Sequence, residues 1–295
     1  MLDWILMAVL AHAFFSLATI TDKIARTKYF RDSAGSALLV LLAQSSPVLL
    51  LPFTNISSLA PDEILLALFA GVMTFLPYWL YADCLKKEDV SRVAPLWQTI
   101  PLFVFVLAFI FLNEKLPPLF YPAFFLLAVG GLLISTKEFK NLLKPDRIFW
   151  LMLLASFLFS VQTVLLKFIY LKAGFLEVLA LLCIGRLLVF PFIMLFPSKR
   201  ERFLSDFLGA DKRVLFAMFI FGALSVSLYN YAIYLGYVSI VEGLSGFYPF
   251  LVLAFAMAVS KWMPSMLYER IERKEILVKA FAATLMFIGL ILLYL

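Results

Sequence analysis

Charged side chains are scarce in this sequence, and that scarcity excludes most soluble folds. Asp, Glu, Lys and Arg make up 15% of the 295 residues and hydrophobic residues make up 64%, whereas soluble domains average roughly 25% and 45–50%. The mean hydropathy is +1.01. The apolar runs are long and continuous, without the alternation of a membrane barrel strand. The composition therefore predicts an all-α integral membrane protein.

Cysteine and histidine are almost absent. The two cysteines, Cys84 and Cys183, lie in or beside apolar runs and predict small buried side chains instead of a disulfide framework. A single histidine argues against a zinc site or a Ser-His triad, and the sequence has no Gly-rich phosphate loop or nucleophile elbow. We therefore expect no metal, no cofactor and no enzyme activity. We attribute the net charge of +6 to basic loops that set the membrane topology, and we expect no nucleic acid partner.

Ten apolar segments of about 20 residues, the length that a bilayer requires, follow one another along the chain. The polar segment 136–147 separates the first five from the last five, and it predicts two units, residues 1–141 and residues 142–295. In chain order the ten predicted spans are 4–21, 35–53, 64–82, 91–112, 119–135, 148–167, 175–196, 213–235, 239–262 and 276–295.

The two units repeat each other in sequence. Residues 90–101 recur as residues 238–249, an offset of 148, and residues 15–23 recur as residues 159–167, an offset of 144. An odd number of spans in each unit turns the second unit upside down relative to the first, an arrangement typical of secondary transporters. The sequence thus predicts ten transmembrane helices arranged as two inverted five-helix repeats.

The distribution of Lys and Arg between the loops predicts the orientation. Counted together with the bordering span ends, loops after odd-numbered spans carry 21 of these residues, and loops after even-numbered spans carry 3. Because basic loops tend to stay in the cytoplasm, this bias predicts a multi-pass protein of the cell membrane (plasma or inner) with both termini outside.

The two halves also share a set of motifs. They are Tyr78, Ser91, Pro101 and Asn113-Glu114-Lys115 in the first half, and residues 231–239 with Pro249 in the second. With these motifs the chain resembles EamA-type members of the drug/metabolite transporter superfamily over essentially its whole length. The resemblance implies a substrate pathway between spans 1–4 and 6–9, with spans 5 and 10 peripheral. It also implies small organic substrates such as amino acids, nucleotide-related metabolites or drugs.

The sequence departs from that family in two places. Family members usually have cytoplasmic termini and a basic loop after span 2, whereas residues 54–62 contain no Lys or Arg. The second half also lacks a clean Gly-Glu-Arg turn after span 9, and its nearest matches are Glu269-Arg270 and Glu272-Arg273. We follow the charge count for the orientation.

Spans 4 and 9 carry the main candidates for substrate binding. In span 4, Trp97, Gln98 and Pro101 share one helical face, and in span 9 the matching face holds Glu242 and Ser245. Proline removes one backbone hydrogen bond and bends a helix. A membrane tolerates such a break only where protein or water covers it. We therefore expect the two faces to meet at the centre of the bundle.

Polar side chains form a stripe on span 1. His12, Ser16, Thr19 and Lys23 lie on one helical face, and span 6 repeats most of the pattern. Lipid offers these groups no hydrogen-bond partner, so the stripe should point toward the protein interior. The alternative is that they only join helices, a common role of Ser and Thr in membranes.

Arg186 is the most unusual residue, because it lies near the middle of span 7. A central arginine costs about 2.5–3.5 kcal/mol unless it is paired or hydrated. We hypothesise that it binds a carboxylate or phosphate of the substrate or pairs with Glu242; alternatively, an ion pair only fixes helix packing. Gln44, Gln98 and Gln162 are intramembrane amides that suit either a ligand or a neighbouring backbone.

Aromatic residues near the ends of spans 3 and 8 complete the candidates. Such side chains usually form the interfacial belt, but Tyr78 and Tyr234 occupy equivalent places in the two halves and could line or gate a cavity. The full set of predicted substrate-binding residues is His12, Ser16, Gln44, Tyr78, Trp97, Gln98, Gln162, Arg186, Asn230, Tyr234, Glu242, Ser245 and Tyr248, with Pro101 and Pro249 as helix bends.

These features predict a secondary-active transporter, an exporter or exchanger, that moves a small polar or amphipathic metabolite such as an amino acid by alternating access. Proton coupling through Glu242, the one well-placed acid, is a hypothesis. The alternatives are a polytopic lipid-modifying enzyme and a channel or non-transporting sensor. The expected partners are the substrate, the bilayer and a coupling proton. Both a monomer and a homodimer fit the sequence.

Overall fold

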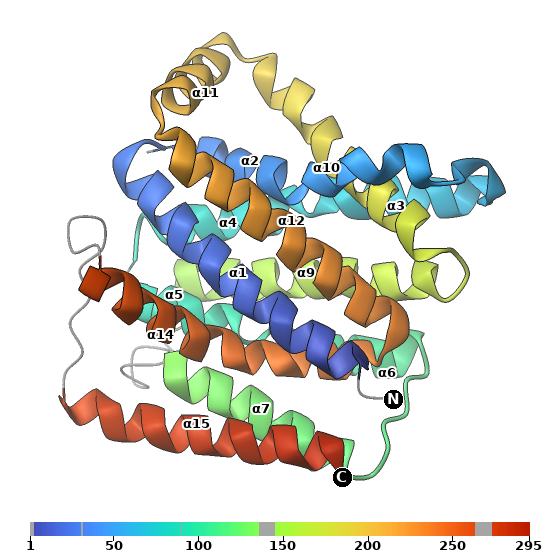
Figure 1. Ribbon diagram of the computed structural model, residues 1–295, viewed down its shortest axis with the longest axis vertical. Helices are drawn as coiled ribbons and strands as arrows, with labels where there is room; N and C mark the ends of the chain where they lie inside the picture. Colours follow the sequence, from blue (N-terminus) through green and yellow to red (C-terminus); the bar gives the residue numbers. More distant parts are fainter. Residues whose placement is uncertain (1–2, 31, 89, 136–144, 263–272) are drawn as a thin grey trace.

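The computed structural model describes residues 3–30, 32–88, 90–135, 145–262 and 273–295, and every regular element in these ranges is helical (Figure 1). The first half contains α1 (Asp3–Lys28), α2 (Ser33–Gln44), η1 (Ser46–Phe53), η2 (Ile56–Ser58), α3 (Pro61–Met73), α4 (Phe75–Cys84), α5 (Val90–Trp97), α6 (Ile100–Phe111) and α7 (Phe120–Ser135). The second contains α9 (Arg147–Tyr170), α10 (Phe175–Met194), α11 (Pro197–Gly209), α12 (Lys212–Leu235), α13 (Val238–Gly243), η3 (Leu244–Gly246), α14 (Phe247–Trp262) and α15 (Arg273–Tyr294). The predicted unit boundary at 141/142 and the turn residues Glu269, Arg270 and Glu272 lie outside the described ranges.

Within the described residues, seven helical segments are long and apolar enough to cross a membrane: Asp3–Lys28, Ser33–Phe53, Pro61–Cys84, Val93–Phe111, Arg147–Tyr170, Phe175–Met194 and Lys212–Leu235. Three shorter apolar helices accompany them: Phe120–Leu133, Val238–Val252 and Ala280–Tyr294. Each predicted span overlaps one of these segments. The all-helical, multi-pass membrane class predicted from the sequence is thus confirmed.

Four of the described membrane segments are interrupted near their middle, and a proline follows each interruption. Pro47 follows the break between α2 and η1, Pro77 the break between α3 and α4, and Pro101 the break between α5 and α6. Pro249 is the third residue of α14, directly after η3. Proline lacks an amide N–H and crowds the preceding turn, so helical geometry is lost just before it. The breaks place the buried polar side chains of Gln44, Ser45, Thr74 and Gln98 inside the bundle.

Glycine permits two close helix contacts. A Cβ atom added to Gly71 of α3 would lie 2.7 Å from the Cα atom of Gly185 in α10. A Cβ atom added to Gly131 of α7 would lie 2.6 Å from the Cα atom of Gly246 in η3. Small residues let membrane helices approach one another in this way. The first contact seats α10 against the first half, and the second seats α7 against the interruption in span 9.

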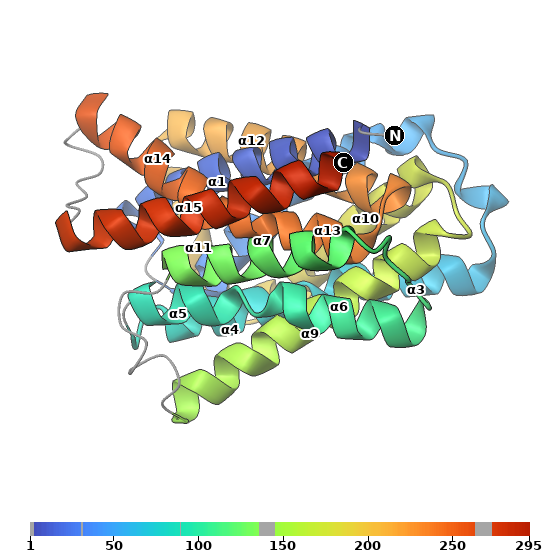
Figure 2. The ribbon, with the colours of Figure 1, turned by 90° about the horizontal axis from the view of Figure 1, so that it is seen from below.

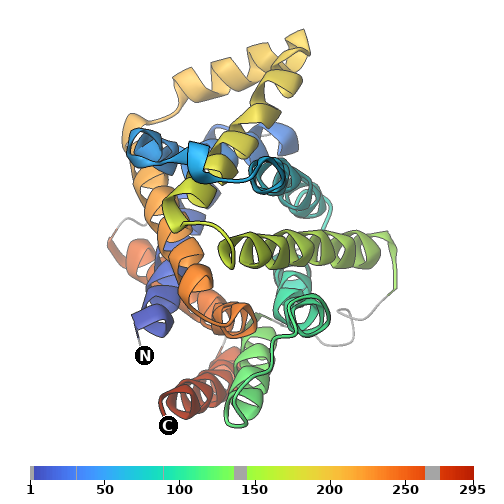
Figure 3. The same cartoon turned by 90° about the vertical axis from the view of Figure 1, so that its right-hand side faces the viewer.

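The central helices come from both halves. Helix α1 packs along α12 and against α14, whereas α9 packs against α3, α4, α5 and α6. Helices α7 and α15 lie side by side at the lower edge of Figure 1 and again in Figure 2. Helix α11 lies at the opposite end of the long axis (Figure 3). The middle of the bundle is therefore formed by α1, α9, α12 and the interrupted segments.

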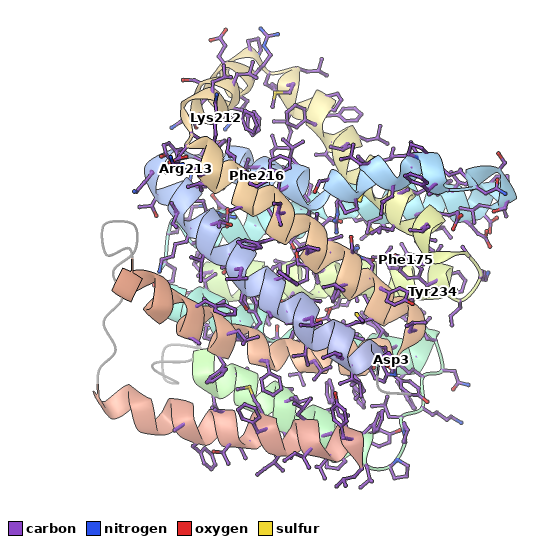
Figure 4. All side chains as sticks on the ribbon, viewed as in Figure 1. Asp3, Phe175, Lys212, Arg213, Phe216 and Tyr234 are labelled. Carbon is purple, nitrogen blue, oxygen red and sulfur yellow. The ribbon has the colours of Figure 1, made fainter. Side chains whose placement is uncertain are left out.

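The two ends of the bundle carry different residues. Both chain termini lie on one side in Figure 1. Figure 4 shows Asp3, Phe175 and Tyr234 toward that side, and Lys212 and Arg213 toward the other. We call the first end, where α6 and α12 finish, the termini face. The second end, where α1 and α4 finish and α11 begins, is the basic-loop face.

Candidate binding cavity

A central cavity of about 500 Å³ lies where the interrupted segments meet α1, α9 and α12. Small-molecule sites usually measure roughly 300–1,000 Å³. The lining follows α1 from His12 to Thr27, near the end of the helix, so the cavity opens toward the basic-loop face. It includes eight of the predicted binding residues: His12, Gln44, Tyr78, Trp97, Gln98, Glu242, Ser245 and Tyr248.

The deep end of the cavity is built around Glu242, whose side chain comes from the short helix α13. Glu242 is 3% exposed, and its Oε1 atom accepts a hydrogen bond from the Tyr229 hydroxyl. His12 Nε2 lies 3.1 Å from the Val241 carbonyl oxygen; because a carbonyl can only accept, Nε2 carries the proton in this contact. The Glu242 carboxyl group and the His12 imidazole thus both lie at the deep end of the cavity, beside the helix break after Gly243.

An aromatic wall, formed by Tyr78, Tyr81, Trp97 and Phe159, lines one side. The ring centroid of Trp97 lies 4.9 Å from that of Tyr81, 5.5 Å from that of Phe159 and 6.1 Å from that of Tyr78. Tyr78 and Phe159 meet edge to face. Aromatic rings packed in such geometries stabilise one another beyond their buried area. The wall is therefore a firm apolar surface that also offers ring faces to a bound cation.

The predicted polar stripe on α1 does face the protein interior. The Ser16 hydroxyl donates to the His12 carbonyl oxygen at 2.7 Å and lies 3.3 Å from that of Tyr248. The Thr19 hydroxyl lies 2.6 Å from the Tyr248 hydroxyl. Ser16 is fully buried and lies behind the cavity lining, where it ties α1 to α14.

The mouth of the cavity contains an ion pair that the sequence interpretation missed. Arg26 Nε lies 2.7 Å from Asp22 Oδ2, one helical turn apart on α1. Asp22 Oδ1, the other oxygen of that carboxylate, is buried without a hydrogen-bond partner among the described residues. The spacing i, i+4 of opposite charges was the available signal. Both residues line the cavity, so its mouth presents one acceptor and one donor to a ligand.

Arg186 lies behind the cavity instead of in its lining. Its side chain is 6% exposed, and one of its terminal nitrogens donates to the Gln44 carbonyl oxygen at 3.3 Å. That carbonyl lies at the end of α2, where the break before Pro47 interrupts the helix. The Gln44 side chain donates to the Tyr78 hydroxyl at 3.2 Å. In the described residues Glu242 bonds to Tyr229, and no ion pair joins it to Arg186.

Three more predicted residues lie outside the cavity lining. Gln162 is 2% exposed between helices. Asn230 accepts a hydrogen bond from the Tyr170 hydroxyl at 3.1 Å and donates to the Val226 carbonyl oxygen at 2.8 Å. Tyr234 lies toward the termini face, close to Phe175 (Figure 4), with ring centroids 6.0 Å apart. These residues join helices in this state of the protein.

Charged groups at the turn between α12 and α13 close the termini face. Lys167 Nζ donates to the carbonyl oxygens of Ile233, Tyr234 and Gly236 at 2.8, 3.3 and 2.7 Å. It therefore caps the end of α12, where carbonyl groups lack helical partners. Aromatic rings of Tyr170, Phe175, Tyr231 and Tyr234 pack beside this cap.

Glu114 completes this closure from the first half. Its carboxylate accepts hydrogen bonds from the backbone amides of Val238 and Ser239, each at 3.0 Å, at the start of α13. Asn113 directs it there by adopting a positive φ of 50° at the end of α6, the left-handed conformation that commonly ends helices. The Asn113-Glu114-Lys115 motif thus joins the end of span 4 to the start of span 9.

Metal chemistry has no evident site here. Among the described residues, no group of three or more His, Cys, Asp or Glu side chains is placed to hold an ion. The cavity lining offers the Glu242 carboxyl group, two amides, an ion pair and aromatic rings.

Comparisons with known proteins agree with this architecture. Residues 2–136 match the EamA-like transporter family. A solved structure described only as "Crystal structure of protein" has a TM-score of 0.64 to the chain, over 97% of this chain and 93% of that one, at 14% identity. So low an identity shows a shared fold alone. No curated protein matches the chain.

Proposed function

We propose that this chain, whose residues 2–136 match the EamA-like transporter family, is a secondary transporter of a small organic solute that works by alternating access. The observation that carries this proposal is the central cavity, which opens toward the basic-loop face and is closed toward the termini face. An alternating-access transporter has such a pathway, open at one end and shut at the other, in each of its two main states.

The proposal includes ten membrane crossings in two inverted five-helix repeats. Reciprocal helix contacts support it. Helix α1 of the first half packs along α12 of the second, and α9 of the second half packs against α3 and α4 of the first. In the same way, α1 contacts α14 and α9 contacts α6. Helices α7 and α15 pack against each other, as a two-fold relation between them requires.

We place the basic-loop face in the cytoplasm, because the loops on that side contain most of the lysine and arginine. Both termini then lie outside. In this orientation the cavity is accessible from the cytoplasm, and the cap formed by Lys167 and Glu114 is the outer gate. Transport requires that gate to open while the mouth beside Asp22 and Arg26 closes.

The lining favours an amphipathic solute with a protonated amine, such as an amino acid or a related compound. The aromatic wall suits an apolar group, and a cation over such rings is stabilised by about 0.5–2 kcal/mol. Glu242 and the Gln44 side-chain oxygen, which lacks a hydrogen-bond partner in the described structure, offer acceptors for an ammonium group. The terminal N–H groups of Arg26, whose Nε faces Asp22, suit a carboxylate at the mouth.

Uptake into proteoliposomes that contain the purified protein tests this function. We expect saturable uptake of a radiolabelled amino acid, competition by excess unlabelled substrate, and accelerated exchange when the vesicles are preloaded. The Trp97→Ala variant should lose most of this uptake, whereas Trp150→Ala, which changes a side chain that is 61% exposed, should retain it. An uptake rate that preloading does not change, or uptake that never saturates, would contradict the proposal and favour a channel.

The same preparation tests the other alternative, a lipid-modifying enzyme. Mass spectrometry of the vesicle lipids and of the solute before and after incubation would reveal a chemical product. Lipids and solute that remain chemically unchanged support transport, whereas a modified lipid would contradict the transporter proposal.

A further inference from the structure

Helix α11 differs from every other long helix in the described structure because it is amphipathic and is not a candidate membrane span. It joins α10 to α12 on the basic-loop face and packs against α10 and α2 (Figures 1 and 3). Phe203 anchors it: this side chain is 4% exposed, and its ring lies 5.7 Å from that of Phe30 and 5.3 Å from that of Phe190. The helix is therefore held to the bundle along one face only.

A second apolar edge of α11 has no protein covering it in the described structure. Leu204 and Leu208, one helical turn apart, are 45% and 80% exposed. Leu195 and Phe196, just before the helix, are 75% and 63% exposed. Leucine side chains so exposed in a charged helix need an apolar environment, because transferring each one out of water contributes roughly 1.5–3 kcal/mol. A lipid bilayer is the apolar phase that this protein always has beside it.

Basic residues surround this edge. Arg200 and Arg202 lie on α11, and Lys212 and Arg213 begin α12; all four side chains are exposed. Figure 4 shows Lys212, Arg213 and the exposed Phe216 in the corner of the molecule where α11 meets α12. Lys199 is already paired with Asp32 at 3.0 Å, so it holds α11 to the turn between α1 and α2. The same stretch contains the acids Glu201, Asp206 and Asp211, so the four exposed basic side chains leave this corner with a small net positive charge.

We propose that α11 lies in the headgroup layer of the leaflet on the basic-loop face and binds anionic phospholipid. Leu204 and Leu208 insert beside the acyl chains, and Arg200, Arg202, Lys212 and Arg213 bind the phosphate groups. Helices with an apolar edge and a basic rim lie in the membrane interface in this way, and each basic residue near an anionic surface adds about 1 kcal/mol. The corresponding connection of the first half, residues 54–60, contains no lysine or arginine and forms only the short η2.

Single-cysteine variants of the full-length protein test this placement. Leu208→Cys places an environment-sensitive fluorophore on the proposed lipid edge, and Gly209→Cys places it about 100° further around the helix, at an exposed position where an added Cβ atom meets open space. Cys84 and Cys183 are buried and are replaced by alanine in both variants. Each variant is reconstituted into nanodiscs of phosphatidylcholine alone or mixed with phosphatidylglycerol, and a water-soluble quencher is added.

We expect the label at residue 208 to be several-fold less quenched than the label at residue 209 when phosphatidylglycerol is present. The charge-neutral variant R200Q/R202Q/K212Q/R213Q should lose the added protection that phosphatidylglycerol gives, and thermal unfolding of each variant checks that the bundle is intact. Equal quenching at the two positions would overturn the interfacial placement. Equal protection with and without phosphatidylglycerol would overturn the assignment of anionic lipid as the ligand.

Discussion

Two lysines at equivalent places in the two halves, Lys23 and Lys167, have different surroundings. They are 144 residues apart, the offset at which their segments repeat. Lys167 is 8% exposed and caps the last carbonyl groups of α12 on the termini face. Lys23 lines the mouth of the cavity on the basic-loop face. The repeated sequence therefore supplies the same side chain at both ends, and the packing of the bundle decides whether it closes the pathway or borders it.

The two faces differ in how closely their helix ends approach one another. At the termini face, the ends of α6, α9, α12 and α13 converge on a short turn, and Glu114 and Lys167 satisfy its backbone groups from both sides. At the basic-loop face, the cavity separates α1 from α4. If the protein alternates between two states, the first set of contacts must break and an equivalent set must form at the other face. Loss of a closing residue should therefore affect transport far more than loss of an exposed residue nearby.

The largest effect is expected for Lys167→Met, which keeps the length of the side chain and removes its charge. Three carbonyl groups then lose a donor, and each orphaned group costs about 1–3 kcal/mol where water cannot replace it. We expect transport to fall to background and the melting temperature in detergent to decrease. Lys172→Met is the matched control, because Lys172 is exposed. Normal uptake by Lys167→Met would show that the cap is not part of a gate.

The same variant tests which face opens. A cysteine at Tyr234, beside the cap, should react slowly with a membrane-impermeant maleimide in the parent protein and several-fold faster when Lys167→Met is added. Equal rates in the two backgrounds would contradict the closed state assigned to the termini face.

A second large effect is expected for Glu242→Gln, at the closed end of the cavity. Glutamine can still accept the hydrogen bond of Tyr229 but cannot bind or release a proton. If Glu242 couples transport to protons, uptake driven by a pH gradient should disappear while exchange between equal substrate pools continues. Glu177→Gln is the control, since Glu177 accepts a hydrogen bond from the exposed Asn55 amide on the termini face. Unchanged gradient-driven uptake in Glu242→Gln would remove the coupling hypothesis.

A moderate effect is expected for Arg26→Gln at the open mouth. The change leaves Asp22 without its cationic partner but keeps a hydrogen-bond donor. If Arg26 binds the carboxylate of an amino acid, the KM for that substrate should rise about tenfold or more, equivalent to roughly 1.4 kcal/mol, while the decarboxylated amine is transported as before. Equal changes for the two substrates would show that Arg26 only supports the fold of the mouth.

The sequence predicts much of the fold and the deep part of the site. Long apolar runs define membrane helices whatever their neighbours are, and the prolines at 101 and 249 mark where polar side chains must meet. Trp97 and Glu242 could be assigned to a common cavity for that reason. Asp22 and Arg26 were missed because charges near the end of an apolar run also suit a solvated interface, and only the fold shows that both line the cavity together with Tyr81 and Tyr248.

Other residues show what a single sequence cannot decide. Arg186, Asn230 and Gln162 are polar groups inside membrane segments, so each must face protein or water. Periodicity does not distinguish a cavity from a helix contact, and all three meet helices in this state. The asymmetry between Lys23 and Lys167 is also invisible in a repeat, because it depends on which of two packings the bundle adopts.

The smallest expected effect concerns the pH dependence of the Lys199–Asp32 contact, which holds α11 to the basic-loop face. Partial burial favours a higher pKa for Asp32, but the hydrogen bonds from Lys199 and the Gly35 amide and the charge of nearby Lys86 outweigh it, so the pKa lies below its usual value of 3.8. A depressed pKa means that the contact stabilises the fold at neutral pH and is lost only as the pH falls below about 4.

Because both side chains are partly exposed, salt and water screen the pair, and Asp32→Asn should lower the free energy of unfolding at pH 7 by only about 0.2–1 kcal/mol. The difference from the parent protein should begin to shrink as the pH falls below about 4 and should vanish only below the depressed pKa of Asp32 in the folded protein. Thermal unfolding of both proteins between pH 3 and pH 7 measures this. A difference that stays constant or grows on acidification would show that the ion pair does not tie α11 to the bundle. Phe203, which is 4% exposed, would then be its anchor.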